Sequence, residues 1–373
     1  MRPANIGQPL LFIHSSNELY GSDRMLLEVL ATLPLAMRDQ ALVWIPDDSE
    51  GSALTERLSS LGFAWRILPL PVLRRQYFSL RGLFGRLRNA FSAWLAMTRL
   101  RPSVVYCTTS ASLGSAPVAR AAGARRVFLH VQEVWSGGEV GVLSVLASLT
   151  SDRICISRTV ESALPRHLRR RSTVILNSVP DSALVVRSAA ENTGPLTFLM
   201  ASRWSPTKGY ETLLRAWVDG PPPGQLHILG GMPPNGNGID VRSLLKDLGS
   251  PETVEVLGEV EHIDQYLVAA DFLIFPSDTP EGFGLLAVEA FRNARAVIAS
   301  RSGGLNEVVK EGVTGHTFAP RDSDGLRAIL SSCTRSEAAS MGRAARITYE
   351  TQYSSDRYAA DFQTVWSSLG ICD

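Results

Sequence analysis

The stretch Phe272-Leu-Ile-Phe-Pro-Ser-Asp-Thr-Pro-Glu281-Gly-Phe-Gly-Leu-Leu-Ala-Val-Glu289-Ala-Phe291 joins a short apolar run to a glycine-containing loop and then to an amphipathic segment. This order predicts a buried strand, a turn and a helix, which is the repeating unit of α/β proteins. The N-terminus of a helix offers unpaired amides and a partial positive charge. Gly282 and Gly284 would let a ligand approach these amides closely.

Such a loop suits a phosphorylated ligand that also carries hydroxyls, such as a nucleotide sugar. The amides would take the phosphates. The carboxylates of Glu281 and Glu289 could accept hydrogen bonds from sugar and ribose hydroxyls. The alternative is an ordinary amphipathic helix, with Leu285 and Leu286 in the core and Glu289 on a solvated face. The segments described next favour the ligand site.

The strand and helix alternation extends through the whole chain and predicts mostly parallel sheets. In the first half the expected strands are 10–14, 40–45, 64–68, 104–107, 127–130, 153–157 and 173–176. In the second half they are 196–201, 225–229, 254–257, 272–275, 296–299 and 316–318. We therefore expect two Rossmann-like domains facing across a cleft, with ligands at the carboxyl ends of the strands.

The expected domain boundaries follow from this alternation. Residues 1–180 would form the first domain, 181–195 a linker and 196–352 the second domain. The amphipathic tail 353–373 would pack back on the first domain as a helix. A length of 373 residues fits two domains better than one.

Cysteine usage and charge restrict the class of protein. The four cysteines are widely separated, which argues against a zinc site or a disulfide framework and favours a reducing compartment. We see no export signal and no apolar run of membrane-spanning length, so we expect a cytoplasmic protein. Residues 1–180 carry a net charge of +9 and residues 181–373 carry −8, so the first half would attract an anionic acceptor, membrane or nucleic acid.

The second domain opens with a pair of cations. Arg203 follows directly on the strand at 196–201, and Lys208-Gly209 precedes a helix that carries Leu213, Leu214 and Trp217. Arginine offers a fork of donors for phosphate oxygens and lysine a point charge. The alternative is a solvated loop with two ordinary charges.

Taken together, these motifs resemble those of the retaining glycosyltransferases of family 4, which have the GT-B fold. The resemblance rests on Arg203, Lys208-Gly209, Gly230-Gly231, Leu257-Gly258, Ala270–Ser277, Glu281-Gly-Phe-Gly with Glu289, Gly303-Gly304-Leu-Asn-Glu307, Glu311–Gly315 and Asn177-Ser-Val. It covers nearly the whole chain and is strongest over residues 198–318.

The resemblance implies roles for the matching positions. Arg203 and Lys208 would hold the donor diphosphate and stabilise the leaving nucleotide, and Glu281 would contact the donor sugar. His130 would lie near the anomeric carbon of that sugar. The implied catalytic residues are thus Arg203, Lys208, Glu281 and His130. The implied donor-binding residues are Gly21, Ser22, Gly231, Gly282, Phe283, Gly284, Leu285, Glu289 and Glu307.

The cations Arg203 and Lys208 agree with this chemistry. The main electrostatic requirement of such a reaction is to neutralise the negative charge of the departing nucleoside diphosphate. No Asp-x-Asp with flanking acids and no His cluster occurs, so we expect no metal and no other cofactor. Retention by front-face attack is implied by the resemblance alone. Taken without the resemblance, His130 is more often a packed histidine at a strand end, and His14 is expected to be structural or to line the cleft.

The chain departs from the family pattern after Glu289. The family continues there with Gly-x-Pro, whereas this chain has Ala294-Arg295-Ala296. A common helix-ending glycine is thereby lost. We expect a local change in structure at this point and not a loss of activity.

The segment 73–101 alternates arginines with bulky apolar residues and contains no acid. Two interpretations remain open: an interfacial helix that binds an anionic membrane surface, or a core helix with a basic outer face. A peripheral location on the inner face of the membrane would follow from the first. No nucleic-acid module is recognisable, so we expect no nucleic-acid partner.

The sequence therefore predicts a hexosyl- or deoxyhexosyltransferase. It would move a sugar from a UDP- or GDP-linked donor to a hydroxyl of a glycan or lipid-linked glycan, in bacterial surface polysaccharide synthesis. Two alternatives stay open, because a fold does not fix a function. One is a nucleotide-sugar epimerase or hydrolase on the same fold, and the other is a catalytically silent homologue that binds nucleotide sugars.

Overall fold

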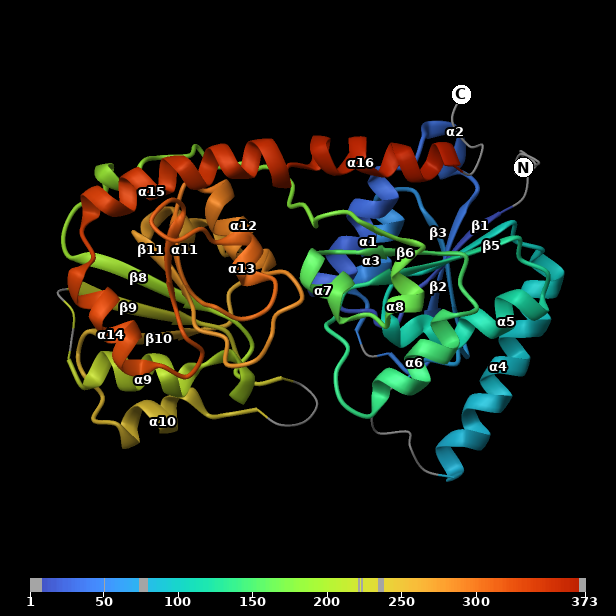
Figure 1. Cartoon of the computed structure of the whole chain (residues 1–373), viewed down its shortest axis with the longest axis horizontal. Helices are drawn as coiled ribbons and strands as arrows, with labels where there is room; N and C mark the ends of the chain where they lie inside the picture. Colours follow the sequence, from blue (N-terminus) through green and yellow to red (C-terminus); the bar gives the residue numbers. More distant parts are fainter. Residues whose placement is uncertain are drawn as a thin grey trace. The chain divides into compact units, whose positions relative to one another are not determined.

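The computed structural model describes residues 9–49, 51–73, 80–220, 222, 224–233 and 238–368. It divides into two compact units (Figure 1). The first unit is Met1–Asn177 with Asp356–Asp373, and the second is Ser178–Ser355. Each unit has its own parallel sheet, as the alternation of strands and helices predicts, so the α/β class is confirmed.

The first unit contains a seven-stranded sheet in the order β3-β2-β1-β4-β5-β6-β7. All neighbouring strands are parallel. The strands are β1 Leu10–Ile13, β2 Ala41–Pro46, β3 Ala64–Leu68, β4 Val104–Cys107, β5 Arg126–Val131, β6 Asp152–Cys155 and β7 Ser172–Val174. Strands β1 and β4 are buried along their whole length, which explains why they read as continuous apolar runs.

Helices connect these strands. They are α1 Gly21–Ala31, α2 Leu35–Arg38, α3 Ala53–Ser60, α4 Leu80–Leu100, α5 Ser115–Ala121, α6 Glu139–Ala147, α7 Arg158–Ala163 and α8 Arg166–Arg169. Helix α1 buries Met25, Leu26, Val29 and Leu30, the apolar stripe expected of a helix that covers a sheet.

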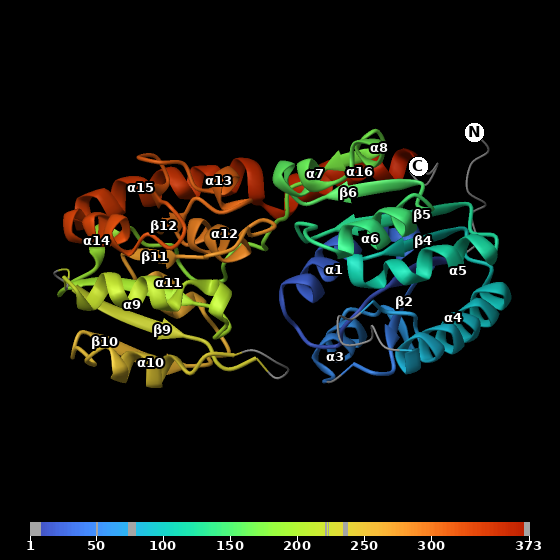
Figure 2. The same cartoon turned by 60° about the horizontal axis from the view of Figure 1, so that its bottom comes forward.

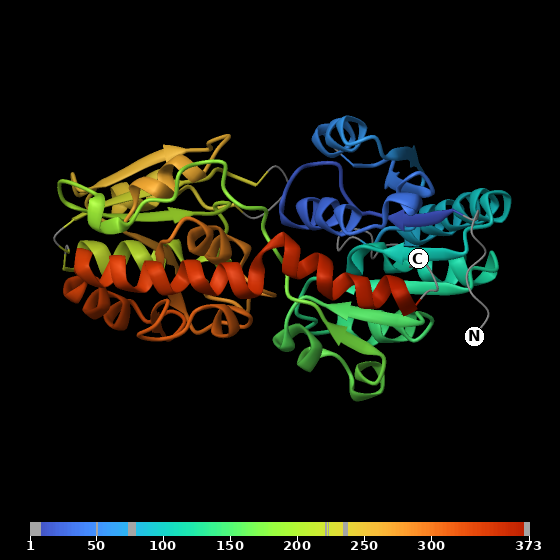
Figure 3. The same cartoon turned by 90° about the horizontal axis from the view of Figure 1, so that it is seen from above.

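The tail helix α16, Ser355–Ser368, completes the first unit. Figure 3 shows it in red alongside the elements of that unit. Trp366 is fully buried, and its indole Nε1 donates to Thr32 Oγ1 at 2.9 Å. The ring of Phe362 lies 6.3 Å from that of His130 between centroids. The amphipathic pattern of the tail is therefore used to cover the sheet.

The second unit contains a six-stranded parallel sheet in the order β10-β9-β8-β11-β12-β13. The strands are β8 Leu196–Ala201, β9 Gly224–Leu229, β10 Val254–Gly258, β11 Phe272–Phe275, β12 Ala296–Ser300 and β13 Gly315–Phe318. The helices are α9 Tyr210–Val218, α10 Val241–Asp247, α11 Asp264–Ala269, α12 Leu285–Arg292, α13 Leu305–Val308, α14 Ser323–Ser332 and α15 Arg335–Thr348. Figure 2 shows α9 and α10 beside the strands.

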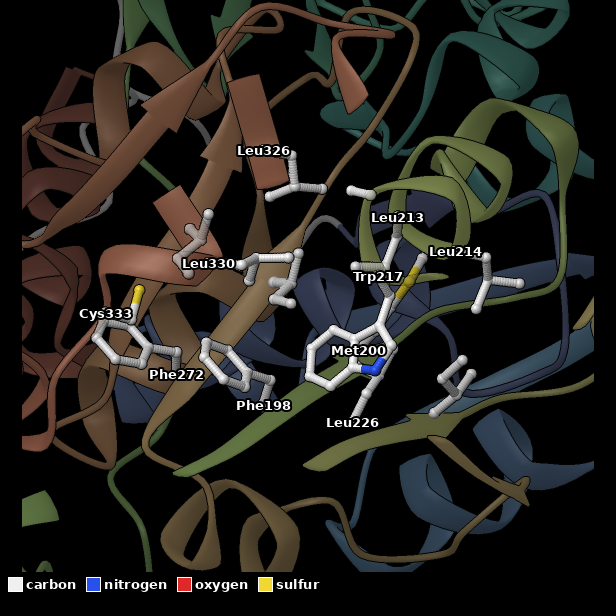
Figure 4. Packing of buried hydrophobic residues seen from close by; sticks show 14 of the residues in the cluster. Phe198, Met200, Leu213, Leu214, Trp217, Leu226, Phe272, Leu326, Leu330 and Cys333 are labelled. Atoms are coloured by element: carbon white, nitrogen blue, oxygen red, sulfur yellow. The ribbon is translucent and has the colours of Figure 1, made fainter. Parts of the chain in front are cut away.

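One core cluster joins a face of this sheet to α9 and α14 (Figure 4). Phe198 of β8 lies between Trp217 and Phe272, with ring centroids 5.5 and 5.7 Å away. Burial of large aromatic rings contributes about 1.5–3 kcal/mol each. This cluster therefore fixes β8 against its neighbour β11, the pair of strands whose loops carry the candidate site.

The segment 181–195, predicted as a linker, lies within the second unit. Asp181 forms an ion pair with Arg346 at 2.7 Å, and Asn192 donates to the buried Asp271 at 3.0 Å. The carbonyl of Arg187 accepts from the guanidinium of Arg295 at 2.8 Å. These contacts tie the segment to α15 and to the residues that directly precede β11 and β12.

The departure from the family pattern has a visible structural consequence. Ala294 adopts a left-handed backbone with a φ of 55°. Arg295 is fully buried and donates to the carbonyls of Leu267 and Val268 as well as that of Arg187. Burial lowers the pKa of its guanidinium to about 10. Ala294 thus stands where the family has glycine and Ala296 where it has proline, and Arg295 between them makes a set of buried hydrogen bonds.

No helix in the described part of the chain has both the length and the apolar character needed to cross a membrane. Within the arginine-rich segment 73–101, residues 74–79 lie outside the described residues. Helix α4 forms the rest of that segment, apart from its two ends.

Candidate functional site

The candidate site lies at the carboxyl ends of β8 and β11 in the second unit. From β8 the chain proceeds to β9 and β10 on one side, and it then returns to place β11 on the other side of β8. This reversal is the topological switch point, where ligands bind in open α/β sheets. The loop after β8 carries Arg203 and Lys208, and the loop after β11 carries Glu281.

The structure brings Lys208 and Glu281 together. The Lys208 Nζ lies 2.7 Å from Glu281 Oε1, although 73 residues separate them. The side chains are 28% and 17% exposed, so the pair is partly buried yet open to solvent. Ser277, at the end of β11, donates its hydroxyl to the same Oε1 atom. One carboxylate oxygen therefore receives both a cationic and a neutral donor.

The position of Lys208 depends on close backbone packing. The short 3₁₀ helix η4, Pro206–Lys208, ends at Gly209, which has a φ of 72°. A Cβ atom on Gly209 would lie 1.8 Å from the carbonyl oxygen of Pro276. The Asp278 amide donates to the carbonyl of Thr207 at 2.9 Å. Only glycine allows the two loops to approach this closely.

Glu281 is held by the loop that follows β12. The Gly304 amide donates to the Glu281 carbonyl at 2.7 Å, and Glu281 forms a parallel bridge with Gly303. A Cβ atom on Gly303 would lie 2.3 Å from that same carbonyl oxygen. The Ser302 hydroxyl donates to the Thr279 carbonyl at 2.6 Å. The three loops after β8, β11 and β12 thus form one interlocked edge.

Helix α12 begins at this edge. Its N-cap is Gly284, with a φ of 115°, and no side chain caps its first turn. Phe283 is buried, with its ring 5.7 Å from that of Tyr353, while Gly282 and Leu285 are half-buried. The first amides of α12 thus follow closely after Glu281 in the chain, and their binding of an anion stays a prediction.

The remaining predicted residues of the second unit occupy more varied positions. Arg203 is exposed directly after β8, and Gly231 accepts a hydrogen bond from the Trp204 amide at 2.8 Å. Glu289 lies one turn inside α12 and is only 4% exposed. Glu307 is half-buried in α13. The solvated-face alternative for Glu289 is therefore wrong, because its side chain points inward.

The predicted residues of the first unit form a separate set. Gly21 and Ser22 are the half-buried first residues of α1. His130 in β5 is 1% exposed, and its Nδ1 lies 3.1 Å from the Tyr106 hydroxyl. Burial lowers the pKa of His130 to about 3, so the imidazole is neutral near pH 7. Their roles towards a ligand stay predictions.

Two polar contacts, those of Ser277 with Glu281 and of His14 with Asp23, were not predicted from the sequence. The signal for the Ser277 contact is a serine at the end of a strand, four residues before Glu281. His14 lies fully buried 3.1 Å from the carboxylate of Asp23. Burial alone would raise the pKa of Asp23, but the hydrogen bond and electrostatic interaction with His14, together with hydrogen bonds from Ser16 and the backbone, lower that pKa. His14 thus has a buried structural contact, which is one of the two roles expected for it.

Among the described residues, no group of three or more His, Cys, Asp or Glu side chains is arranged to hold a metal ion. Metal-independence of the chemistry stays a prediction.

Comparison with known proteins gives one family. Residues 184–348 match the model of the family described as glycosyl transferases group 1. An uncharacterized glycosyltransferase of Methanocaldococcus jannaschii is 31% identical over 173 residues, which is 45% of this chain and 46% of that protein. The lipopolysaccharide 1,2-N-acetylglucosaminetransferase of Salmonella typhimurium is 45% identical over 58 residues, or 15% of each chain. The matches span less than half of the length of these curated relatives.

A solved structure extends the likeness to nearly the whole chain. HepE of Anabaena, solved in complex with UDP-glucose, superposes with a TM-score of 0.79 at 21% sequence identity, over 96% of this chain and 99% of that one. At this identity the likeness shows the fold. It confirms the expected GT-B fold, with two Rossmann-like domains.

Proposed function

We propose a function from the premise that this chain belongs, through residues 184–348, to the glycosyl transferases group 1 family. In this proposal, the protein transfers a sugar from a UDP- or GDP-linked donor to a hydroxyl of a glycan or lipid-linked glycan acceptor. The structural neighbour in complex with UDP-glucose supports a nucleotide-sugar donor. The lipopolysaccharide glycosyltransferase among the relatives supports a role in surface polysaccharide synthesis.

The observation that carries the proposal is the Lys208–Glu281 pair at the switch point of the second sheet. A site for a nucleotide sugar needs cations and amides that bind the diphosphate, and a hydrogen-bond acceptor for the hydroxyls of the sugar. Lys208 and the first turn of α12 supply the former, and Glu281 supplies the latter.

The reaction would proceed with retention by front-face attack. Arg203 and Lys208 stabilise the charge that develops on the departing diphosphate, which is the dominant electrostatic need. The leaving phosphate takes the proton of the acceptor hydroxyl as the new glycosidic bond forms. His130 would act at the donor sugar as a neutral imidazole, since its pKa is about 3. No essential metal enters this scheme.

We further propose that helix α4 brings the protein to an anionic membrane surface. It contains no Asp or Glu. Leu87 and Phe91 are 61% and 60% exposed one turn apart, with exposed Arg88 beside them and exposed Arg99 further along. Apolar side chains with neighbouring arginines are typical of interfacial helices.

Calorimetry with UDP, GDP, ADP and dTDP tests donor binding, and transfer assays with the matching nucleotide sugars test activity. Lys208→Ala should lower kcat by about 10²–10³-fold, the usual effect of removing a charge-stabilising group. The matched control is Lys246→Ala, which removes an exposed lysine from α10 in the same unit. An unchanged kcat in Lys208→Ala would refute the assignment. Incubation of the protein with the donor alone distinguishes a transferase from the two rival enzyme classes. An epimerase would form the epimer of the donor, and a hydrolase would form its hydrolysis product.

Sedimentation with anionic and neutral liposomes tests the membrane proposal. The double variant Leu87→Ser/Phe91→Ser and the variant Arg88→Glu should each reduce binding to anionic vesicles by about tenfold. Leu35→Ser is the control, because Leu35 is 79% exposed on α2 of the same unit. Equal binding by all variants would remove the membrane from the proposed function.

A further inference from the structure

We propose that Glu281 selects against the free nucleoside diphosphate and in favour of the intact nucleotide sugar, and thereby promotes product release. This inference rests on the proposed function. It concerns what the carboxylate does to the diphosphate through Lys208, beyond contacting the sugar.

Lys208 and Glu281 form an ion pair in the structure. The Nζ of Lys208 lies 2.7 Å from Glu281 Oε1, and the same oxygen accepts from the Ser277 hydroxyl. Both charged side chains are more than two-thirds buried, so their interaction is less screened than that of a surface pair. A diphosphate that enters this site therefore meets an ion pair of zero net charge in place of a free ammonium.

The carboxylate opposes a free diphosphate in a second way. Phosphate oxygens that reach Lys208 must come within a few ångströms of Glu281, and like charges at that distance repel. The diphosphate group itself carries no donor that could compensate the carboxylate, because ionised phosphate oxygens are hydrogen-bond acceptors. The pair thus weakens binding of the product.

The donor differs from the product by the sugar, whose hydroxyls are hydrogen-bond donors. Glu281 has further acceptor positions beyond those used by Lys208 and Ser277, since an ionised carboxylate offers about four. Sugar hydroxyls at these positions offset the repulsion with charge-assisted hydrogen bonds. The same carboxylate is therefore favourable for the donor and unfavourable once the sugar has left.

The test is calorimetric titration of the full chain with UDP and UDP-glucose, and with GDP and GDP-mannose. Glu281→Gln removes the charge and keeps an amide oxygen that can accept from both Lys208 and Ser277. We expect its Kd for the free diphosphate to fall by about tenfold, while the Kd for the nucleotide sugar changes by less than about threefold. Glu281→Ala should also lower the Kd for the free diphosphate.

Two controls isolate the charge. Ser277→Ala removes a hydrogen bond and leaves the charge, so its affinity for UDP should stay within about twofold of the wild type. Glu255→Gln removes a carboxylate of β10 that is 65% exposed in the same unit, and it should have no effect. Thermal unfolding shows that each variant is folded.

Unchanged or weaker binding of the free diphosphate by folded Glu281→Gln overturns the inference and leaves the proposed function intact. If the wild type binds neither diphosphate, the proposed function itself fails, and the inference falls with it. Stronger product inhibition by UDP or GDP in the variant would support selective release.

Discussion

The substitution Gly209→Ala tests how the two loops of the candidate site are held together. Gly209 has a φ of 72°, and a Cβ atom would lie 1.8 Å from the carbonyl oxygen and 2.7 Å from the carbonyl carbon of Pro276. Contacts this short do not occur, so either the loop of Lys208 or the loop of Ser277 must move. The substitution therefore adds a steric overlap to the strain of a left-handed alanine.

Both effects have estimable sizes. A left-handed backbone costs a non-glycine residue roughly 1–2 kcal/mol, and overpacking costs about 1–3 kcal/mol more. Alanine also lowers the conformational entropy of the unfolded chain, which stabilises the folded state by about 0.4–1 kcal/mol. Gly209→Ala should thus destabilise the second unit by about 3 kcal/mol. Gly312 has a φ of 70° and no atom within 4 Å of a Cβ position, so Gly312→Ala shows the strain alone.

Urea unfolding of both variants measures the difference, and calorimetry with the donor nucleotide measures its consequence for Lys208. We expect Gly312→Ala to lose about 0.5–1 kcal/mol and to bind the nucleotide normally. Gly209→Ala should lose more stability and bind the nucleotide at least tenfold more weakly, since a displaced ammonium loses a charge-assisted bond. Equal losses in the two variants would refute the argument from loop packing.

Three further substitutions test features of the fold. Burial lowers the pKa of His130 to about 3, so only the unfolded chain takes up this proton as the pH falls below about 6.5, and stability declines. Between about pH 7.5 and pH 5, the free energy of unfolding of His130→Gln should therefore fall by about 2 kcal/mol less than that of the wild type, as measured by urea titrations at each pH. An equal fall in both proteins would contradict this. Ala294→Gly should raise the Tm by relieving the left-handed backbone, with a gain of up to about 1 kcal/mol; a lower Tm would show that the methyl group matters more. Arg295→Met leaves several buried carbonyls without a donor and should cost about 3 kcal/mol in urea unfolding, whereas Arg215→Met, at a surface pair 52% exposed, should cost under about 1 kcal/mol.

Local sequence patterns predicted the secondary structure well where a segment is buried or bounded by glycine. The expected strands 104–107, 196–201 and 272–275 coincide with β4, β8 and β11. The glycine loop before residue 285 correctly predicted the start of α12. These patterns depend on neighbouring residues, because burial and turn geometry act over a few positions.

Long-range contacts decided what local patterns left open. The buried guanidinium of Arg295 and its carbonyl partners could not be predicted, since the partners come from α11 and from the segment 181–195. The burial of His130 depends on α16, more than 200 positions later in the chain. Ser277 gains its significance only from the side chain that it meets.

The sequence alone determined the two α/β units, the loops that follow their strands and the types of side chain in those loops. These features depend on strand periodicity and turn chemistry, which are set by residues close together in the sequence. Only the tertiary structure decided that β11 lies beside β8, and hence that the ammonium of Lys208 meets the carboxylate of Glu281. The physical reason is that strand order is set by how whole helices and sheet faces bury their apolar area. A contact between two charges 73 residues apart is a consequence of that packing.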